Sequence, residues 1–565
     1  MQDSTNKITR TRWYKDAVVY QIYPRSFCDS NGDGIGDLRG IISKLDYLKE
    51  LGITCVWLSP CYKSPNDDNG YDISDYRDIM DEFGTLEDWD EMVKGMHERG
   101  IKLVMDLVSN HSSDEHYWFK EAKKSRDNPY HDYYIWRDAH GNKKKKPNNW
   151  TSRFGGTAWE YNEATDEFYL HLFTRKQPDL NWDNPKVRKE IQDIVKFWLD
   201  RGCDGFRCDV ITYISKEEGL PNGKFNPFTC GDEHFTHGPN IHKYLHELNV
   251  NVLSHYDCMT VGEGPGLGIE EGILYTNEDR AELDTMFTFE HVNVDTIMQA
   301  LPKKFKLPKL KAVFEKYQTQ IRGKGWNSLY FENHDQPRSM PRFVGDYGDK
   351  HDEAAKMLAT ALYMMQGTPY VFEGQELGMT NYPFKTLDEF EDVLVTYVID
   401  VINKIKIIPW AKKVALKVFQ KRARDHGRTP MQWNDSENAG FSTGKPWMPV
   451  NPNYTEINAE KEMANPDSVW HYYKELIAYR LGNEVIINGD FVQYYPKHKD
   501  IYVYKREYEG KKLLVIANFK NKEVKFTMPD VKFDGYKVAL HNYKGDIKPE
   551  DTVLKPYEAV VFELN

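Results

Sequence analysis

An arginine and an aspartate lie two residues apart in the short apolar stretch 205–210, which has the sequence GFRCDV. Side chains two residues apart on a β-strand point to the same face, so Arg207 and Asp209 are expected to be neighbours. A fixed guanidinium stabilises the ionised form of a nearby carboxylate, and an ionised aspartate can act as a nucleophile at neutral pH. The same pair is also compatible with a purely structural ion pair at a strand end.

Three other clusters of polar residues follow apolar stretches, namely residues 106–111 (DLVSNH), Glu263 and residues 333–335 (NHD). Glycoside hydrolysis requires two carboxyl groups in different environments, one ionised to attack the anomeric carbon and one protonated to release the leaving oxygen. Arg207 suits Asp209 to the first role. Glu263 has no cation beside it in the sequence, which favours its protonated form and the acid role.

These clusters must be positioned by a regular scaffold, and the chain repeats one pattern of amphipathic helix, glycine, apolar strand and polar loop. Helix-like stretches end at Gly52, Gly100 and Gly202, and glycine is the residue that most often terminates a helix. Strands are expected at residues 18–23, 56–58, 103–107, 205–210, 259–261, 328–331 and 370–372. Repeated βα units form a parallel sheet, and these favour a closed (β/α)8 TIM barrel with its active site where the strands end.

Two departures from this pattern divide the chain into domains. The sequence predicts a catalytic barrel formed by residues 1–107 and 186–485, which includes a subdomain at about 380–458. Residues 108–185 are expected to form an inserted domain after the third strand, because a segment of that length is too long for an idle loop. Short strands of period two predict a C-terminal antiparallel β-sandwich domain at residues 486–565.

The composition argues against several classes of partner. The 565 residues carry a formal net charge of -12, which disfavours nucleic acid and anionic membranes as partners. No apolar run approaches the length of a membrane span, and the polar N-terminus lacks the core of a signal peptide. The seven cysteines show no zinc-like spacing and are expected to be free thiols. We therefore expect a cytoplasmic monomer that binds a small molecule.

With these clusters in view, the chain from Trp13 to its end resembles glycoside hydrolase family 13, the α-amylase superfamily, and within it the oligo-1,6-glucosidase and α-glucosidase subfamily. The resemblance is carried by residues 106–111, 205–209, 261–263 (VGE), 333–335 and 177–181 (QPDLN). It implies that Asp209 is the nucleophile, Glu263 the acid/base and Asp335 the stabiliser of the transition state. Attack by the first and proton transfer by the second would give two inversions and net retention of the α configuration.

The resemblance also implies a set of substrate-binding residues. His111, Arg207 and His334 match positions that bind the sugar in the cleavage subsite. Asp68 and Tyr71 match residues that grip and stack on the non-reducing terminal glucose, and Arg424 matches an arginine that reaches it. Phe154 and Gln177 are expected to form walls of the aglycone subsite.

In this subfamily the residue after the nucleophile is associated with linkage specificity. Valine goes with α-1,6 bonds and threonine with α-1,4 bonds, and here it is Val210. The expected substrates are therefore isomaltose and isomalto-oligosaccharides. Trehalose-6-phosphate hydrolases also carry valine there, so these enzymes, sucrose isomerases and broader α-glucosidases remain alternatives. Gly264 is smaller than the residue expected after the acid and could widen the aglycone side. A non-catalytic transporter subunit is disfavoured because all three carboxylates are present.

A second site is suggested by residues 29–37 (DSNGDGIGD), where oxygen-bearing residues alternate with glycines. This spacing resembles the first part of a calcium-binding loop, although Gly40 stands where such loops usually carry a glutamate. The expected ligands of a structural Ca²⁺ are Asp29, Asn31, Asp33, Ile35 and, by analogy with relatives, Asp37. The alternative is a turn rich in Asp and Asn that holds no metal.

Overall fold

A computed structural model describes residues 9–139, 145–226, 229–297, 301–404, 409–551 and 553–565. Its centre is a parallel sheet of eight strands in the order β11-β10-β9-β5-β2-β1-β15-β14. The strands are β1 (Val19–Ile22), β2 (Cys55–Leu58), β5 (Lys102–Val108), β9 (Gly205–Asp209), β10 (Met259–Gly264), β11 (Thr285–Thr288), β14 (Ser328–Leu329) and β15 (Thr368–Phe372). A parallel bridge between Met286 and Asn327 joins the two ends, so the sheet closes into the predicted barrel.

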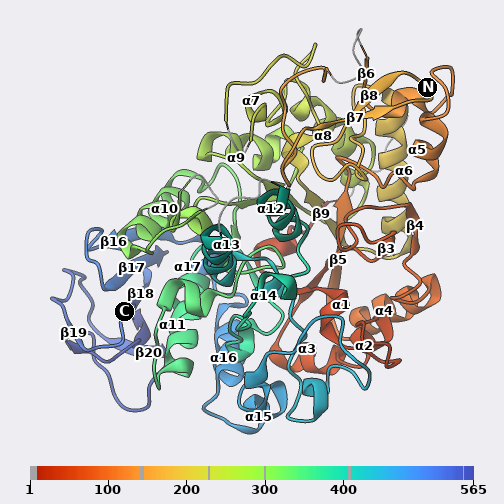
Figure 1. The fold of residues 1–565 in the computed structure, drawn as a ribbon. Helices are drawn as coiled ribbons and strands as arrows, with labels where there is room; N and C mark the ends of the chain where they lie inside the picture. Colours follow the sequence, from red (N-terminus) through yellow and green to blue (C-terminus); the bar gives the residue numbers. More distant parts are fainter. Residues whose placement is uncertain (1–8, 140–144, 227–228, 298–300, 405–408, 552) are drawn as a thin grey trace.

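The predicted helices alternate with these strands (Figure 1). Gly52 ends α3 (Leu45–Leu51) at φ 96°, and Gly202 ends α6 (Pro185–Arg201) at φ 113°. Both values lie in the left-handed region that favours glycine, which confirms the two helix ends predicted there. Further helices of the barrel are α4 (Leu86–Glu98), α8 (Ile241–Asn251), α9 (Ile269–Thr276), α10 (Leu307–Gln320) and α11 (His351–Tyr363).

The segment between β5 and α6 has a small sheet and a core of its own. Strands β6 (Trp136–Asp138), β8 (Glu167–Leu170) and β7 (Trp159–Asn162) pair antiparallel in that order, next to α5 (Tyr117–Ala122). Its apolar cluster of Trp150, Trp159 and Phe168 also contains Val210 and Tyr213 from the barrel. The insertion therefore packs directly on the loop that follows β9.

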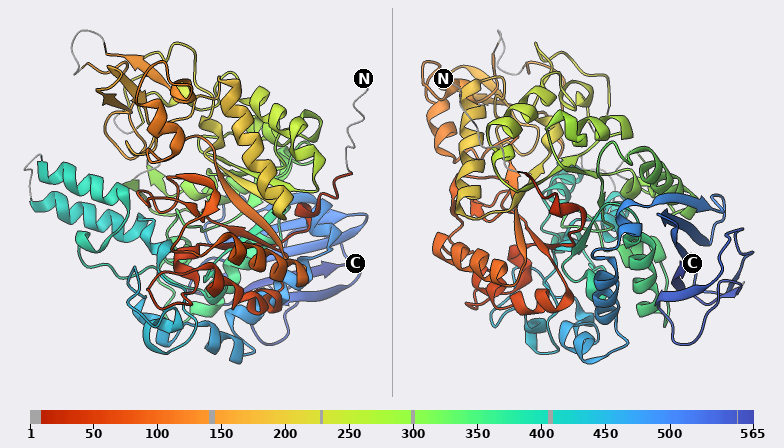
Figure 2. Two further views of the ribbon diagram at one scale, coloured as in Figure 1. Left: turned by 90° about the vertical axis from the view of Figure 1, so that its right-hand side faces the viewer. Right: turned by 180° about the vertical axis from the view of Figure 1, so that it is seen from behind.

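A helical hairpin follows β15. Helices α12 (Val393–Lys404) and α13 (Pro409–Arg422) lie side by side and project from the molecule, as Figure 2 shows in its left view. The short helix α14 (Asp425–Arg428) then returns the chain to the barrel. The hairpin approaches the insertion, because a Cβ atom added to Gly155 would lie 2.1 Å from the ring of Tyr397.

The C-terminal part forms two antiparallel sheets. The larger has the order β16 (Asp490–Tyr494), β17 (Ile501–Tyr508), β18 (Lys511–Asn518), β22 (Ala559–Leu564) and β20 (Tyr536–His541). The smaller pairs β19 (Val524–Lys525) with β21 (Val553–Leu554), and apolar residues of both pack into one core. Lys311 on α10 donates hydrogen bonds to three carbonyl oxygens, those of Tyr495, His498 and Ile501, which links this part to the barrel.

The predicted fold class, a (β/α)8 barrel with an insertion and a C-terminal antiparallel β-structure, is confirmed. None of the helices in the described ranges is long and apolar enough to cross a membrane. All seven cysteines are free and buried, as predicted.

Candidate active site

Arg207 is the centre of the polar cluster at the C-terminal ends of the barrel strands. It pairs in register with Asp106 of β5, and one terminal nitrogen donates to Oδ1 of Asp106 at 2.8 Å and to Oδ1 of Asp209 at 2.6 Å. Its other terminal nitrogen lies 2.8 Å from Oε2 of Glu263 on β10. The sequence-based view that Glu263 lacks a cation is therefore wrong, since adjacent parallel strands bring Arg207 to it.

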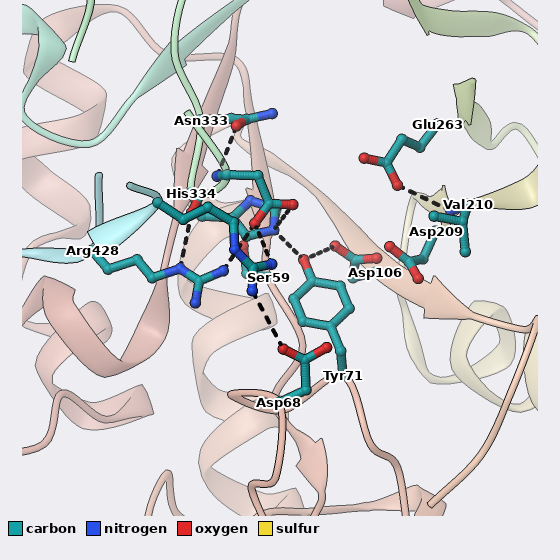
Figure 3. A network of polar contacts seen from close by, with 12 residues as sticks. Ser59, Asp68, Tyr71, Asp106, Asp209, Val210, Glu263, Asn333, His334 and Arg428 are labelled. Atoms are coloured by element: carbon teal, nitrogen blue, oxygen red, sulfur yellow. Dashed lines mark hydrogen bonds and ion pairs between the residues drawn. The ribbon is translucent and has the colours of Figure 1, made fainter. Parts of the chain in front are cut away.

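Three carboxylates thus share one guanidinium, and Figure 3 shows Asp106, Asp209 and Glu263 facing one another. Burial raises the pKa of Asp209, and the charges of Glu263 and Asp106 raise it further, although Arg207 opposes them. Burial likewise raises the pKa of Asp106 to about 6 against the effect of Arg207. Arg207 favours the ionised form of Asp209, as the sequence predicts, but burial and the two neighbouring carboxylates act against it. A cluster with more carboxylates than cations favours retention of a proton, which is what an acid catalyst requires.

The backbone after β9 fixes the orientation of Glu263. The amide of Val210 donates to Oε2 of Glu263 at 3.0 Å, so Arg207 and this amide engage the same oxygen. Val210 has φ 34° and ψ 40°, a left-handed conformation that β-branched residues rarely adopt. Such strain is found where the surrounding structure enforces a functional geometry. No hydrogen bond from another described residue engages Oε1 of Glu263, which leaves that oxygen available for a proton directed at a substrate.

The third predicted catalytic carboxylate, Asp335, is surrounded by cationic side chains. Its Oδ1 accepts hydrogen bonds from Arg428 at 2.9 Å and from Arg424 at 3.2 Å. Burial opposes ionisation of Asp335, but the guanidinium groups of Arg424 and Arg428 oppose burial and lower its pKa. Asp335 is therefore ionised at neutral pH, in contrast to the proton-retaining cluster around Arg207.

Tyr71 and His334 connect these two groups. Their rings stack with centroids 5.4 Å apart, and the hydroxyl of Tyr71 lies 2.6 Å from Nε2 of His334 (Figure 3). The same hydroxyl donates to Oδ2 of Asp106 at 3.2 Å. Burial lowers the pKa of His334 to about 3, so its imidazole is neutral at neutral pH.

Gln177, a predicted wall of the aglycone subsite, is fully buried. Its amide nitrogen donates to Oδ2 of Asp68 at 3.1 Å and lies 3.2 Å from Nε2 of His111. Gln177 thus orients two predicted sugar-binding residues from beneath. Burial lowers the pKa of His111 to about 4, so this imidazole is also neutral.

Arg424 lies beside Asp68, and its partners include a residue that the sequence did not reveal. It binds both carboxylate oxygens of Asp392, at 2.6 and 3.0 Å. Its guanidinium covers the ring of Phe154 at 5.2 Å and lies 3.8 Å from Oδ1 of Asp68. The segment after β15 and the insertion therefore meet at the site through Arg424 and Phe154.

The sequence prediction missed Arg428 and Asp392 as site residues. Arg428 could have been found, because Arg424 and Arg428 are four residues apart in a helical stretch and such residues lie on one face. Asp392 gave no such signal, because it precedes Arg424 by 32 residues in the sequence and only folding brings the two side chains into contact.

Comparison with known proteins agrees with this geometry. Residues 21–489 match the family model described as the catalytic domain of α-amylase, and residues 501–561 match that of the SusG-type α-amylase C-terminal domain. The chain belongs to the α-amylase family, glycoside hydrolase family 13. It is an enzyme of the glycoside hydrolase class.

Within the α-amylase family, the chain is similar over nearly its whole length to the following three proteins. An oligo-1,6-glucosidase of Bacillus cereus is 55% identical over 98% of this chain and 99% of its own. The crystal structure of a Bacillus licheniformis trehalose-6-phosphate hydrolase is 44% identical, with a TM-score of 0.92 over 98% of this chain and 99% of its own. The structure of an isomaltulose synthase from Klebsiella sp. LX3 is 42% identical, with a TM-score of 0.93 over the same shares.

Gly264, which follows the predicted acid/base Glu263, does not open extra space beside it. A Cβ atom at Gly264 would lie 2.2 Å from Cδ1 of Leu267 and 2.8 Å from Cε of Met286. The side chains of Leu267 and Met286 therefore occupy the volume that a larger residue would fill. The expected extra space is not present.

The loop 29–37 precedes α2 (Leu38–Ile42), and its side chains fold back on their own backbone. Asp29 accepts from the amides of Gly32 and Gly34, while Asp37 caps α2 by accepting from the amide of Gly40. Within the described ranges no three His, Cys, Asp or Glu side chains converge as a metal site. The oxygen donors themselves are of the kind that Ca²⁺ prefers, so the predicted site stays a prediction.

Proposed function

We propose that the protein is a retaining, exo-acting α-glucosidase that hydrolyses α-1,6-glucosidic bonds at the non-reducing ends of isomaltose and isomalto-oligosaccharides. The observation that carries the proposal is that Asp209 and Glu263 bind the two terminal nitrogens of one guanidinium. A shared guanidinium favours the shorter of the two carboxyl separations known in glycosidases, about 5–5.5 Å in retaining enzymes against about 6.5–9.5 Å in inverting ones.

Each step of the reaction has a group that suits it. Oδ1 of Asp209 is bound to Arg207, which leaves Oδ2 to attack the anomeric carbon. As the bond to the glycosidic oxygen breaks, Glu263 donates a proton to that oxygen, and a β-glucosyl-enzyme forms. Water then attacks the anomeric carbon while Glu263 accepts its proton, which releases glucose with the α configuration and restores Asp209. The negative charge of Asp335 favours the cationic transition state.

The exo-acting mode is supported by Asp68. Its Oδ1 is buried and lacks a hydrogen-bond partner among the described residues, while Gln177 holds Oδ2. A buried acceptor without a donor is costly, so a sugar hydroxyl placed there would satisfy it. Arg424, 3.8 Å away, brings a donor to the same point. Such a pair suits the last glucose of a chain, whose hydroxyls are all free.

The α-1,6 linkage is supported by Val210 and by the name of the 55% identical relative, oligo-1,6-glucosidase. The names of the other two relatives keep trehalose-6-phosphate hydrolysis and sucrose isomerisation as alternatives. The pairing of the site arginines favours a neutral sugar over a phosphate, because Arg207 is paired with three carboxylates, Arg424 with Asp392 and Arg428 with Asp335.

The test is to compare kcat/KM for isomaltose, maltose, sucrose, trehalose and trehalose 6-phosphate, with Asp209→Asn as the inactive control. We expect isomaltose to be preferred over maltose and glucose to be released as the α anomer. Preference for trehalose 6-phosphate would refute the substrate but keep the mechanism. Conversion of sucrose without release of glucose would identify an isomerase.

We also propose that the loop 29–37 holds a structural Ca²⁺ through Asp29, Asn31, Asp33, Asp37 and the backbone carbonyl of Ile35. Burial raises the pKa of Asp29, but hydrogen bonds from Ser442, Gly32 and Gly34 outweigh it and lower the pKa, so its carboxylate is available to a cation. We expect a chelator to lower the melting temperature and Asp33→Ala to remove the response to Ca²⁺. An unchanged melting temperature with and without Ca²⁺ would refute the site.

We infer that the enzyme acts in the cytoplasm as a monomer. Seven buried free thiols are consistent with a reducing compartment. Light scattering at several concentrations tests the oligomeric state, and a stable dimer would contradict the inference.

A further inference from the structure

Gln21 contacts His334, although it lies outside the five sequence stretches that carry the family resemblance. It lies on β1 and is 1% exposed. Its amide nitrogen lies 2.7 Å from Nδ1 of His334 and donates to Oγ of Ser59 at 3.1 Å. A buried glutamine in a barrel interior needs partners for its amide, and here one of them is a ring nitrogen of a substrate-binding residue.

The other ring nitrogen of His334 has acceptors around it. Nε2 lies 2.6 Å from the hydroxyl of Tyr71 and 3.4 Å from Oδ2 of Asp335. A neutral imidazole carries its proton on only one nitrogen, and the partner of the other nitrogen decides which one. If Nε2 lacked the proton, its lone pair would face the carboxylate of Asp335.

We propose that Gln21 is a positioning residue that fixes His334 in the neutral tautomer with the proton on Nε2. The proposal rests on the proposed function, because His334 matters through the sugar that it binds. Gln21 donates to Nδ1, which leaves Nε2–H to donate toward Tyr71 and Asp335. The hydroxyl of Tyr71, having accepted from His334, then donates to Asp106.

The hydrogen bond that Tyr71 donates to Asp106 affects which carboxyl group of the cluster carries a proton. Oδ1 of Asp106 accepts from Arg207, and its Oδ2 accepts from Tyr71 and from the indole of Trp57. These three hydrogen bonds favour the ionised form of Asp106, against the burial that raises its pKa to about 6. The proton that the cluster retains is thereby left to Asp209 and Glu263, where catalysis uses it.

The groups around His334 also oppose a second proton on its ring. Burial between the rings of Tyr71 and Tyr23 and the guanidinium groups of Arg207, Arg428 and Arg424 oppose that proton, while the carboxylate of Asp335 favours it. One carboxylate faces three cations, and the ring is fully buried. Only the neutral tautomer that Gln21 selects is compatible with these surroundings.

The direct test is to record nitrogen NMR spectra of the full-length enzyme with ¹⁵N-labelled histidine, and to identify the His334 signals by their loss in His334→Asn. We expect Nδ1 of His334 to be unprotonated and Nε2 to be protonated in the wild type. Nδ1 found protonated would overturn the proposal. This measurement needs no substrate, so it is independent of whether the proposed function is correct.

Two variants give the kinetic test on p-nitrophenyl α-glucoside. In Gln21→Glu a carboxylate would accept from Nδ1–H and favour a doubly protonated ring. We expect kcat/KM to fall about 10- to 100-fold at neutral pH, the factor that corresponds to the loss of a hydrogen bond to a charged group, and to rise with pH where the wild type is flat. Gln21→Met removes the donor without adding charge, and we expect a mixture of tautomers and a decrease of about fivefold in kcat/KM.

Gln318→Glu is the matched control, because Gln318 on α10 is also buried but contacts Arg506 and Gln366 away from the site. Its pH profile should equal that of the wild type. If Gln21→Glu fails to fold, Gln21→Met still decides the question. Wild-type kinetics together with an unchanged tautomer in Gln21→Met would overturn the proposal.

Discussion

Replacement of Arg428 by methionine tests whether the charge of Asp335 depends on the arginines around it. Arg428 is buried and donates to Oδ1 of Asp335 at 2.9 Å and to the carbonyl oxygen of His334 at 3.0 Å. A hydrogen bond to a charged group contributes about 1.5–3 kcal/mol, and about 1.4 kcal/mol corresponds to a factor of ten. Because Arg424 still contacts the same oxygen at 3.2 Å, one such contact is lost. We expect kcat/KM to fall about 10- to 100-fold.

The pH profile should change in a definite direction. Burial opposes ionisation of Asp335, while the guanidinium groups of Arg424 and Arg428 lower its pKa. Without Arg428 the pKa of Asp335 rises, so activity is lost at a higher pH as the solution is acidified. Stability follows the same sign, because a carboxylate with a lowered pKa stabilises the fold above its unfolded pKa and this contribution is lost on acidification.

The assay is kcat/KM for p-nitrophenyl α-glucoside between about pH 4 and pH 8, the range in which carboxylates and histidines titrate. Arg422→Met is the matched control, because Arg422 lies on the same segment but binds Asp295. It should leave the acid limb of the profile in place. An Arg428→Met enzyme with wild-type kcat/KM and an unshifted acid limb would refute this account of Asp335.

The other predictions concern Gly264, Asp68 and Lys311. Gly264→Met forces a side chain against Leu267 and Met286, and urea unfolding should show a loss of about 1–3 kcal/mol; unchanged stability would contradict the packing argument. Burial raises the pKa of Asp68 to about 7, so its ionisation destabilises the sugar-free fold as the pH rises from about 4 to 7. Asp68→Asn should flatten the fall in melting temperature over that range while raising KM, and an unaltered slope would count against it. Lys311→Met removes three hydrogen bonds to carbonyls and should cost about 2 kcal/mol in urea unfolding, whereas a neutral effect would show that they are not needed.

Much of the fold could be predicted because its signals are local. Gly52 and Gly202 end their helices in the left-handed conformation that the sequence pattern indicated. The strand β11 was missed, since Thr285–Thr288 is short and half polar, and only its pairing with β10 and Asn327 makes it part of the barrel. Short strands of this kind are defined by partners that lie far away in the sequence.

The sequence by itself determined the residue types of the site and the strand ends on which Asp209 and Glu263 lie, with Asp335 in the loop after β14. Tertiary structure decided their charges, because a pKa depends on burial and on every neighbouring charge. Arg207 forms ion pairs with three carboxylates, and Asp335 forms ion pairs with two arginines. The roles of Gln177, Gly264 and Gln21 were decided in the same way, since each follows from contacts between segments that only folding brings together.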